Sequence, residues 1–293
     1  MKPAPFEYVR ATQLGDALAA LASDDDAKVI AGGQSLVPLM ALRLARPALL
    51  VDVNDLPLDT VEVANNEVRL GSLVRHVRLE RDAVVVRAAP LLAEAAALIG
   101  YPAIRNRGTL GGSVAHADPA AELPAALVAL DGVVLAEGRE GTRRISARDF
   151  FEGFLTTVLA PDELVVGVQV PVAAERHGAS FREWAPRAGD FAVAGVAVVI
   201  ELDAGGVCVS LGAAACGVGS TPVDLHEVLT DAGVLGASDV GDSLLRSTAQ
   251  AAARTARGDD DREQLVGLLT AAALHDAFAR ARGGDASGTG VAA

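Results

Sequence analysis

Two glycine-rich segments restrict what this chain can fold into. They read AGGQSL at residues 31–36 and IRNRGTLGGS at residues 104–113, and each carries a serine, Ser35 or Ser113. Adjacent glycines remove the side chains that would hold a ligand away from the backbone, and they permit positive φ, so amide N–H groups can converge on phosphate oxygens. Neither segment has the spacing of the Rossmann G-x-G-x-x-G or the P-loop G-x-x-x-x-G-K-[ST] motif. The pair therefore predicts a dinucleotide site in a different fold.

The first segment lies where a buried strand gives way to a helix. Residues 29–31 are apolar, and residues 35–44 have helical spacing with Pro38 in the first turn. The start of a helix adds partial positive charge to free amide groups, which favours a phosphate. A tight turn without a ligand would leave the same pattern around one Gly-Gly pair. Two such segments in different parts of the chain favour the binding interpretation.

Charged residues surround the second segment. Arg105 and Arg107 lie within it, and two interpretations stay open for them: they bind phosphate, or they are solvated side chains beside a turn. Asp118 and Glu122 follow at the start of a predicted helix, where carboxylates suit the helix dipole. The same carboxylates can accept hydrogen bonds from ribityl or ribose hydroxyls, and the two roles are compatible.

The other chemistry-bearing residues argue against hydrolysis and against a metal site. The histidines show no ligand-like spacing to one another or to the cysteines. Only His116, beside the second glycine segment, is placed to touch a ligand. The chain has no G-x-S-x-G nucleophile elbow.

The charge and the cysteines limit the partners of the chain. A formal net charge of -13 repels nucleic acid and anionic membranes, and no run of Lys or Arg relieves it. We find no apolar leader and no run of about 18 apolar residues, so we expect a cytoplasmic protein without membrane insertion. Cys208 and Cys216 cannot supply the four thiolates of an ordinary iron-sulfur cluster, and we interpret both as small buried residues in a reducing compartment.

Hydrophobic patterning predicts an α+β fold. In residues 1–55, a helix at 12–22 with Thr12 as its N-cap precedes strands at 29–31 and 49–53, and the helix between these strands favours parallel pairing.

Beyond residue 55 the pattern changes twice. In residues 56–172, segments 61–63 and 68–73 predict antiparallel pairing around Asn65-Asn66. Other elements expected there are helices at 89–99 and 119–130 and strands at 133–136 and 163–170. Residues 173–282 predict strands at 191–202 and 207–215, followed by helices at 239–257 and 262–282. Residues 283–293 are expected to form a disordered tail.

Taken together, five segments resemble the FAD-binding medium subunit of the molybdenum hydroxylases, the family of carbon monoxide dehydrogenase and xanthine dehydrogenase. They are residues 31–36, residues 104–113, Asp118-Pro119 with Glu122, PDEL at 161–164 and GDFA at 189–192. The likeness spans nearly the whole chain. It implies a two-subdomain FAD-binding fold of the vanillyl-alcohol-oxidase/PCMH type, formed by residues 1–55 and 56–172, followed by a C-terminal strands-then-helices domain.

The resemblance also implies which residues hold the cofactor. Glu122 matches an acidic position that binds the ribityl chain, and Phe191 matches a position often held by Tyr. The usual paired basic residues are reduced here to Pro186-Arg187. The full set of predicted FAD-binding residues is Ala31, Gly32, Gly33, Gln34, Ser35, Leu36, Ile99, Ile104, Thr109, Gly112, Ser113, His116, Asp118, Glu122, Leu164, Val165, Arg182 and Phe191.

Electron transfer is the activity that the resemblance implies. FAD would accept electrons from the [2Fe-2S] clusters of an iron-sulfur small subunit and deliver them to an external acceptor, while a molybdopterin large subunit would carry the molybdenum cofactor and the substrate site. A heterotrimer or its dimer is the family assembly. Gln34 stands where some relatives carry His, so FAD would be bound non-covalently. Two alternatives stay open: a freestanding FAD oxidoreductase of the same fold, and a flavin-free scaffold subunit.

Overall fold

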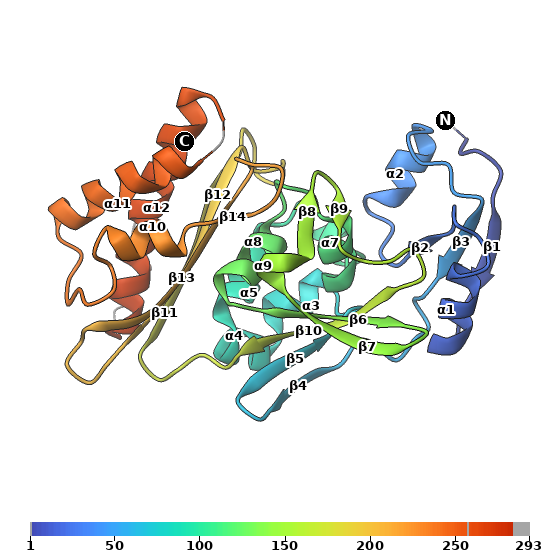
Figure 1. The fold of residues 1–293 in the computed structure, drawn as a ribbon, viewed down its shortest axis with the longest axis horizontal. Coiled ribbons are helices and arrows are strands. Elements are labelled where there is room, and N and C mark those ends of the chain that lie inside the picture. Colours follow the sequence, from blue (N-terminus) through green and yellow to red (C-terminus); the bar gives the residue numbers. More distant parts are fainter. Residues whose placement is uncertain (1, 257, 284–293) are drawn as a thin grey trace.

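The computed structural model describes residues 2–256 and 258–283 (Figure 1). Three sheets follow one another along the chain, with a short hairpin beside the second. The predicted tail at 283–293 lies outside the described residues except for Gly283, and so does Arg257 at the end of a predicted helix. Within the described residues, no helix is both long and apolar enough to cross a membrane.

The first sheet is small and parallel, with the order β1 (Glu7–Arg10), β3 (Leu49–Asp52) and β2 (Lys28–Ile30). The predicted parallel pairing of the second and third strands is confirmed, whereas β1 was not predicted. Helix α1 (Leu14–Leu21) buries its apolar face, but its N-cap is Gln13 without a side-chain hydrogen bond, so the prediction of Thr12 was wrong. Helix α2 (Leu36–Ala41) is shorter than predicted, because Arg43 adopts a left-handed φ of 60°.

The second sheet is antiparallel, and its order is β4 (Val61–Ala64), β5 (Glu67–Gly71), β10 (Leu164–Pro171), β6 (Val133–Gly138) and β7 (Gly141–Ser146). The predicted turn between the first two strands is confirmed, and both Asn65 and Asn66 have positive φ. Seven helices and the hairpin accompany this sheet: α3 (His76–Arg81), α4 (Ala83–Ala88), α5 (Pro90–Leu98), α6 (Pro102–Arg105), α7 (Leu110–His116), α8 (Glu122–Ala129), α9 (Ala147–Phe150), β8 (Phe151–Gly153) and β9 (Thr156–Thr157).

The third sheet is antiparallel, with the order β11 (His177–Trp184), β12 (Ala194–Leu202), β13 (Cys208–Cys216) and β14 (Val223–Asp224). Its helices are α10 (His226–Asp231), α11 (Asp242–Thr255) and α12 (Asp260–Ala281). The strand predicted from residue 191 begins only at Ala194, and the sequence did not predict β11. Strands followed by helices were predicted here, and the structure confirms that order.

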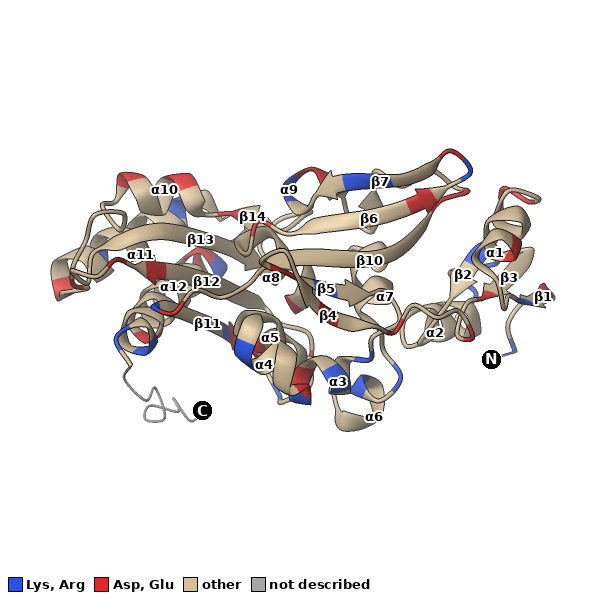
Figure 2. Cartoon of the chain, turned by 90° about the horizontal axis from the view of Figure 1, so that it is seen from below, with Lys and Arg blue, Asp and Glu red and all other residues tan. Residues whose placement is uncertain are grey.

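Helices α5 and α8 lie between the second and third sheets (Figure 1). One continuous hydrophobic core joins them to both sheets, through residues such as Leu92, Leu127, Val168 and Ala214. Helix α12 packs on the other face of the third sheet, against β11 and β12. In the view of Figure 2, Lys and Arg are scattered among acidic residues and do not form one stripe.

Candidate dinucleotide site

The two glycine-rich loops lie against each other, although about seventy residues separate them in the sequence. A Cβ atom at Gly32 would overlap the carbonyl oxygen of Arg107 and would stand 2.8 Å from the Cα atom of Gly108. A Cβ atom at Gly108 would in turn stand 2.7 Å from the ring of His76. Glycine has no Cβ atom, so it permits this close approach at both positions. The two loops can therefore pack directly against each other.

The first loop presents unpaired backbone donors. Within the described residues, the amides of Gly32, Gly33, Gln34 and Ser35 have no hydrogen-bond acceptor. Gly33 has a φ of 71°, and its carbonyl accepts from the amide of Val37, which turns the chain into α2. The Gln34 side chain donates to the Gly32 carbonyl at 3.0 Å. Successive free amides in such a turn form an anion-binding concavity.

The second loop differs, because its amides are already paired. Gly111 donates to the Ser72 carbonyl at 2.8 Å, and Gly112 donates to the Thr109 hydroxyl at 3.1 Å. Ser113 donates its amide to the Thr109 carbonyl at 3.0 Å. The second loop therefore packs closely against its neighbours and leaves few amides unpaired. The unpaired amides of the site belong to the first loop.

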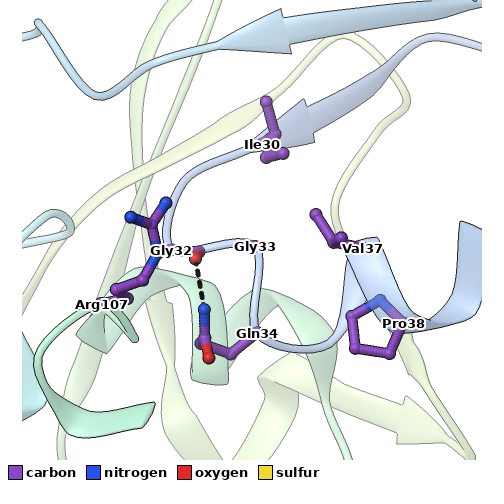
Figure 3. A pocket seen from close by; sticks show the side chains of 7 residues that line it. All are labelled: Ile30, Gly32, Gly33, Gln34, Val37, Pro38 and Arg107. Carbon is purple, nitrogen blue, oxygen red and sulfur yellow. Dashed lines mark hydrogen bonds between the residues drawn. The ribbon is translucent and has the colours of Figure 1, made fainter. Parts of the chain in front are cut away.

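A pocket of about 300 Å³ opens beside the first loop. Ile30, Val37 and Pro38 form its apolar side, and Gly32, Gly33, Gln34 and Arg107 form its polar side (Figure 3). The pocket thus places one cation and several amides beside an apolar surface, a combination that suits a nucleotide.

A chain of hydrogen bonds fixes the two loops relative to each other. Asn54 donates to the Ala31 carbonyl at 2.9 Å and accepts from the Arg75 guanidinium at 2.8 Å. Arg75 also donates to the Arg107 carbonyl. Neither Asn54 nor Arg75 was predicted from the sequence, because they lie in the connections that follow β3 and β5 and carry no local signal.

The Arg105 side chain is engaged by the protein and is not a solvated side chain beside the turn. Its guanidinium pairs with Glu80 at 2.9 Å and donates to the carbonyls of Ile99 and Gly100 at 3.2 and 2.9 Å. These contacts hold the connection between α5 and α6 in place. Arg107 is exposed and lines the pocket.

Glu122 lies in a buried acidic cluster on the side of α8 that faces the third sheet. Glu122 is only 6% exposed. Burial, together with the nearby charges of Glu183 and Asp118, raises the pKa of Glu122 to about 8. Burial also raises the pKa of Glu183 on β11 to about 7, and one of its carboxylate oxygens is buried without a partner among the described residues. A protonated carboxyl both donates and accepts, which suits a hydroxyl-bearing ligand.

Arg182 and Glu183 point to opposite faces of β11, as neighbouring residues in a strand must. Arg182 faces α12 and pairs with Asp276, with Nε at 2.6 Å from the carboxylate. The side chain of Glu183 lies beside Gly195, in the same row as Cys216, toward α8. The sequence named Arg182 and missed Glu183, because the boundaries of β11 were not visible in the local pattern.

The remaining predicted residues fall on several elements around the loops. His116 ends α7, and Asp118 accepts from the amide of Ala120 at 2.9 Å. Phe191 is 67% exposed in the loop before β12, and Gly189 of that loop lies against the Tyr101 ring. The others are placed as follows: Ala31 and Leu36 flank the first loop, Ile99 is the C-cap of α5, Ile104 lies in α6, and Leu164 and Val165 are buried at the start of β10.

Unpaired backbone amides, an adjoining pocket and three successive sheets define the class of this protein as an α+β fold with a candidate dinucleotide site. The family described as the FAD binding domain in molybdopterin dehydrogenase matches residues 4–173. Among related proteins, subunit alpha of the 6-hydroxypseudooxynicotine dehydrogenase complex of Paenarthrobacter nicotinovorans is 44% identical, over 78% of this chain and 77% of its own length. The carbon monoxide dehydrogenase medium chain of Afipia carboxidovorans is 33% identical, over 96% and 100%.

Solved structures agree with the sequence relatives. Carbon monoxide dehydrogenase from Hydrogenophaga pseudoflava superposes with a TM-score of 0.91 at 35% identity, covering 96% of this chain and 99% of that one. Quinoline 2-oxidoreductase from Pseudomonas putida 86 superposes with a TM-score of 0.89 at 33% identity, covering 96% and 99%. The chain belongs to the family of FAD-binding subunits of molybdenum hydroxylases. The resemblance and the fold class predicted from the sequence are confirmed.

Proposed function

We propose that this chain is the FAD-binding medium subunit of a molybdenum hydroxylase and relays electrons from the iron-sulfur clusters of a partner subunit to an external acceptor. The observation that carries this proposal is the first glycine loop, which has four amides without an acceptor among the described residues and lines the pocket beside Arg107 through Gly32, Gly33 and Gln34. Family membership identifies the dinucleotide as FAD. Bound flavin supplies the redox chemistry, and the protein supplies binding and orientation.

The residues of the site fit FAD. Gly32, Gly33, Gln34 and Ser35 would hold the pyrophosphate through their amides, because these donors are free and no Cβ intrudes at Gly32 or Gly33. In its protonated form, Glu122 would donate a hydrogen bond to a ribityl hydroxyl or accept one from it. We propose the residues predicted from the sequence as the binding set, with Arg182 left out because its guanidinium is committed to Asp276.

The cysteines of this chain indicate which cofactors must come from partner subunits. Cys208 and Cys216 are buried thiols, and burial raises the pKa of Cys208 to about 11, which disfavours the thiolate that a cluster requires. An iron-sulfur small subunit and a molybdopterin large subunit would therefore supply the clusters and the molybdenum cofactor. We also propose a cytoplasmic location, which the two free thiols favour.

We further propose that residues 1–55 and 56–172 form two FAD-binding subdomains and that residues 173–282 form a C-terminal domain. This division is supported by the strand pairing, because each of the three sheets with more than two strands draws its strands from one of these segments.

The test begins with the full chain purified alone. We expect a visible flavin absorption band that dithionite bleaches, and heat should release FAD. Substrate of the holoenzyme should bleach the band only after the two partner subunits are added. Bleaching by substrate without partners would make the chain a freestanding oxidoreductase. A colourless protein that takes up no added FAD would indicate a flavin-free scaffold subunit.

A further inference from the structure

We propose that Arg107 is the cation that pairs with the pyrophosphate of FAD and so strengthens binding of the dinucleotide over riboflavin. This inference rests on the proposed function, because it assigns a role at the same site. It goes beyond the proposed function, since it decides between the two interpretations that the sequence left open for Arg107.

The position of Arg107 is set by its neighbours. Its carbonyl oxygen is in contact with Gly32 on one side and accepts from the Arg75 guanidinium on the other. The backbone of Arg107 is therefore clamped between the first loop and the connection that follows β5. The side chain that starts from this backbone lines the pocket together with Gly33 and Gln34 (Figure 3).

The guanidinium of Arg107 differs from its neighbours in having no acceptor among the described residues. It forms neither an ion pair nor a side-chain hydrogen bond with them, whereas Arg75 and Arg105 nearby are both engaged. The carboxylate of Asp52 accepts from Tyr8 and Asn54, and it forms no ion pair with Arg107. The Arg107 guanidinium and the unpaired amides of Gly32, Gly33 and Gln34 are therefore donors at one pocket from which a phosphate could accept.

The electrostatics of Arg75 agree with this description. Its pKa is lowered first by burial and then by the positive charge of Arg107. A bound dianion would relieve that repulsion. Because the whole chain has a net charge of -13, an anionic ligand gains from a local cation that lines the pocket.

The test measures FAD affinity on the deflavinated full chain. Charge-assisted hydrogen bonds at a partly exposed site predict that Arg107→Gln weakens FAD binding by about 10-fold. Riboflavin, which lacks the phosphates, should bind wild type and variant equally. ADP carries the same pyrophosphate, so its inhibition constant should rise in the variant by a factor similar to that for FAD. Added salt should weaken FAD binding less in the variant, because one screened attraction is gone. Arg107→Lys should restore part of the affinity.

Arg81→Gln is the matched control. It removes the same charge from α3, where the Arg81 side chain is 67% exposed and does not line the pocket. This variant should bind FAD as the wild type does.

Three results would overturn the proposal. In the first, Arg107→Gln binds FAD with wild-type affinity and wild-type salt dependence. In the second, it loses FAD and riboflavin equally, together with thermal stability, which would make Arg107 a structural residue. In the third, only assembly with the partner subunits is impaired, which would place Arg107 in an interface. A wild-type chain that binds no FAD would instead refute the proposed function, and the inference with it.

Discussion

The Nε2 atom of His76 lies 2.9 Å from the carbonyl oxygen of Thr109, so a buried imidazole on α3 holds the N-cap of α7 and with it the second glycine loop. The same nitrogen lies 3.1 Å from the Ser113 hydroxyl. A carbonyl can only accept, so Nε2 carries the proton of the neutral ring. Burial is the main reason that the pKa of His76 falls to about 4.

Stability should therefore fall on mild acidification. Between pH 6.5 and pH 4 the unfolded chain binds a proton at His76 that the folded chain excludes, so the free energy of unfolding decreases as pH falls. The full contribution is roughly 3 kcal/mol. Urea unfolding at pH 7 and at pH 4.5 measures it, and His76→Gln should show a smaller decrease. His177, whose pKa is also lowered to about 4, contributes equally to both proteins and cancels in the comparison. Equal decreases in both proteins would contradict the prediction.

Glu122 should have the opposite pH dependence. Its folded-state pKa of about 8 lies above the ordinary 4.5, so the folded chain binds the extra proton and the free energy of unfolding decreases as pH rises through this interval. Glu122→Gln removes that decrease and should stabilise the flavin-free protein at pH 8 by roughly 4 kcal/mol relative to its effect at pH 4.5. Glu62→Gln, at an exposed position on β4, is the control. A Glu122→Gln effect that is the same at both pH values would refute the buried, protonated carboxyl.

Gly32→Ala should separate the two glycine loops. The new methyl group would meet the backbone of Arg107 and Gly108, which cannot rotate away as a side chain could. We expect a loss of about 2 kcal/mol in stability and no measurable FAD binding. Gly15→Ala in α1 is the matched control, because no described atom beyond its chain neighbours and the backbone of its own helix comes within 4 Å of the place that its methyl group would take, and alanine favours a helix. Thermal unfolding and flavin titration measure both variants, and normal FAD binding by Gly32→Ala would contradict the role given to this contact.

Arg182 should stabilise the third sheet without binding FAD. Arg182→Ala leaves Asp276, which is 6% exposed, without its cationic partner, and we expect a cost of about 3 kcal/mol. Asp276→Ala should cost less, because the Arg182 side chain is 31% exposed and can reach water. FAD affinity should be unchanged in both variants. If Arg182→Ala weakens FAD binding while Asp276→Ala does not, Arg182 belongs to the cofactor site after all.

Local patterns in the sequence predicted most of the elements that carry the site. The apolar run before Gly32 predicted β2, and Asn65-Asn66 predicted the turn between β4 and β5. Strand β11 was missed because its neighbourhood is polar at residues 174–178 and interrupted by Gly178. That glycine is required by tertiary packing, since a Cβ atom there would overlap the backbone of α12 at Ala277.

The sequence by itself determined the family, the α+β class and the two glycine loops, because these depend on contiguous residues and their spacing. Only the tertiary structure decided how the loops meet, which of their amides stay free, and that Glu183 rather than Arg182 faces Glu122. The shifted pKa values of His76 and Glu122 likewise come from burial. These properties arise from groups far apart in the chain that strand pairing and core packing bring together, and no local pattern encodes such distances.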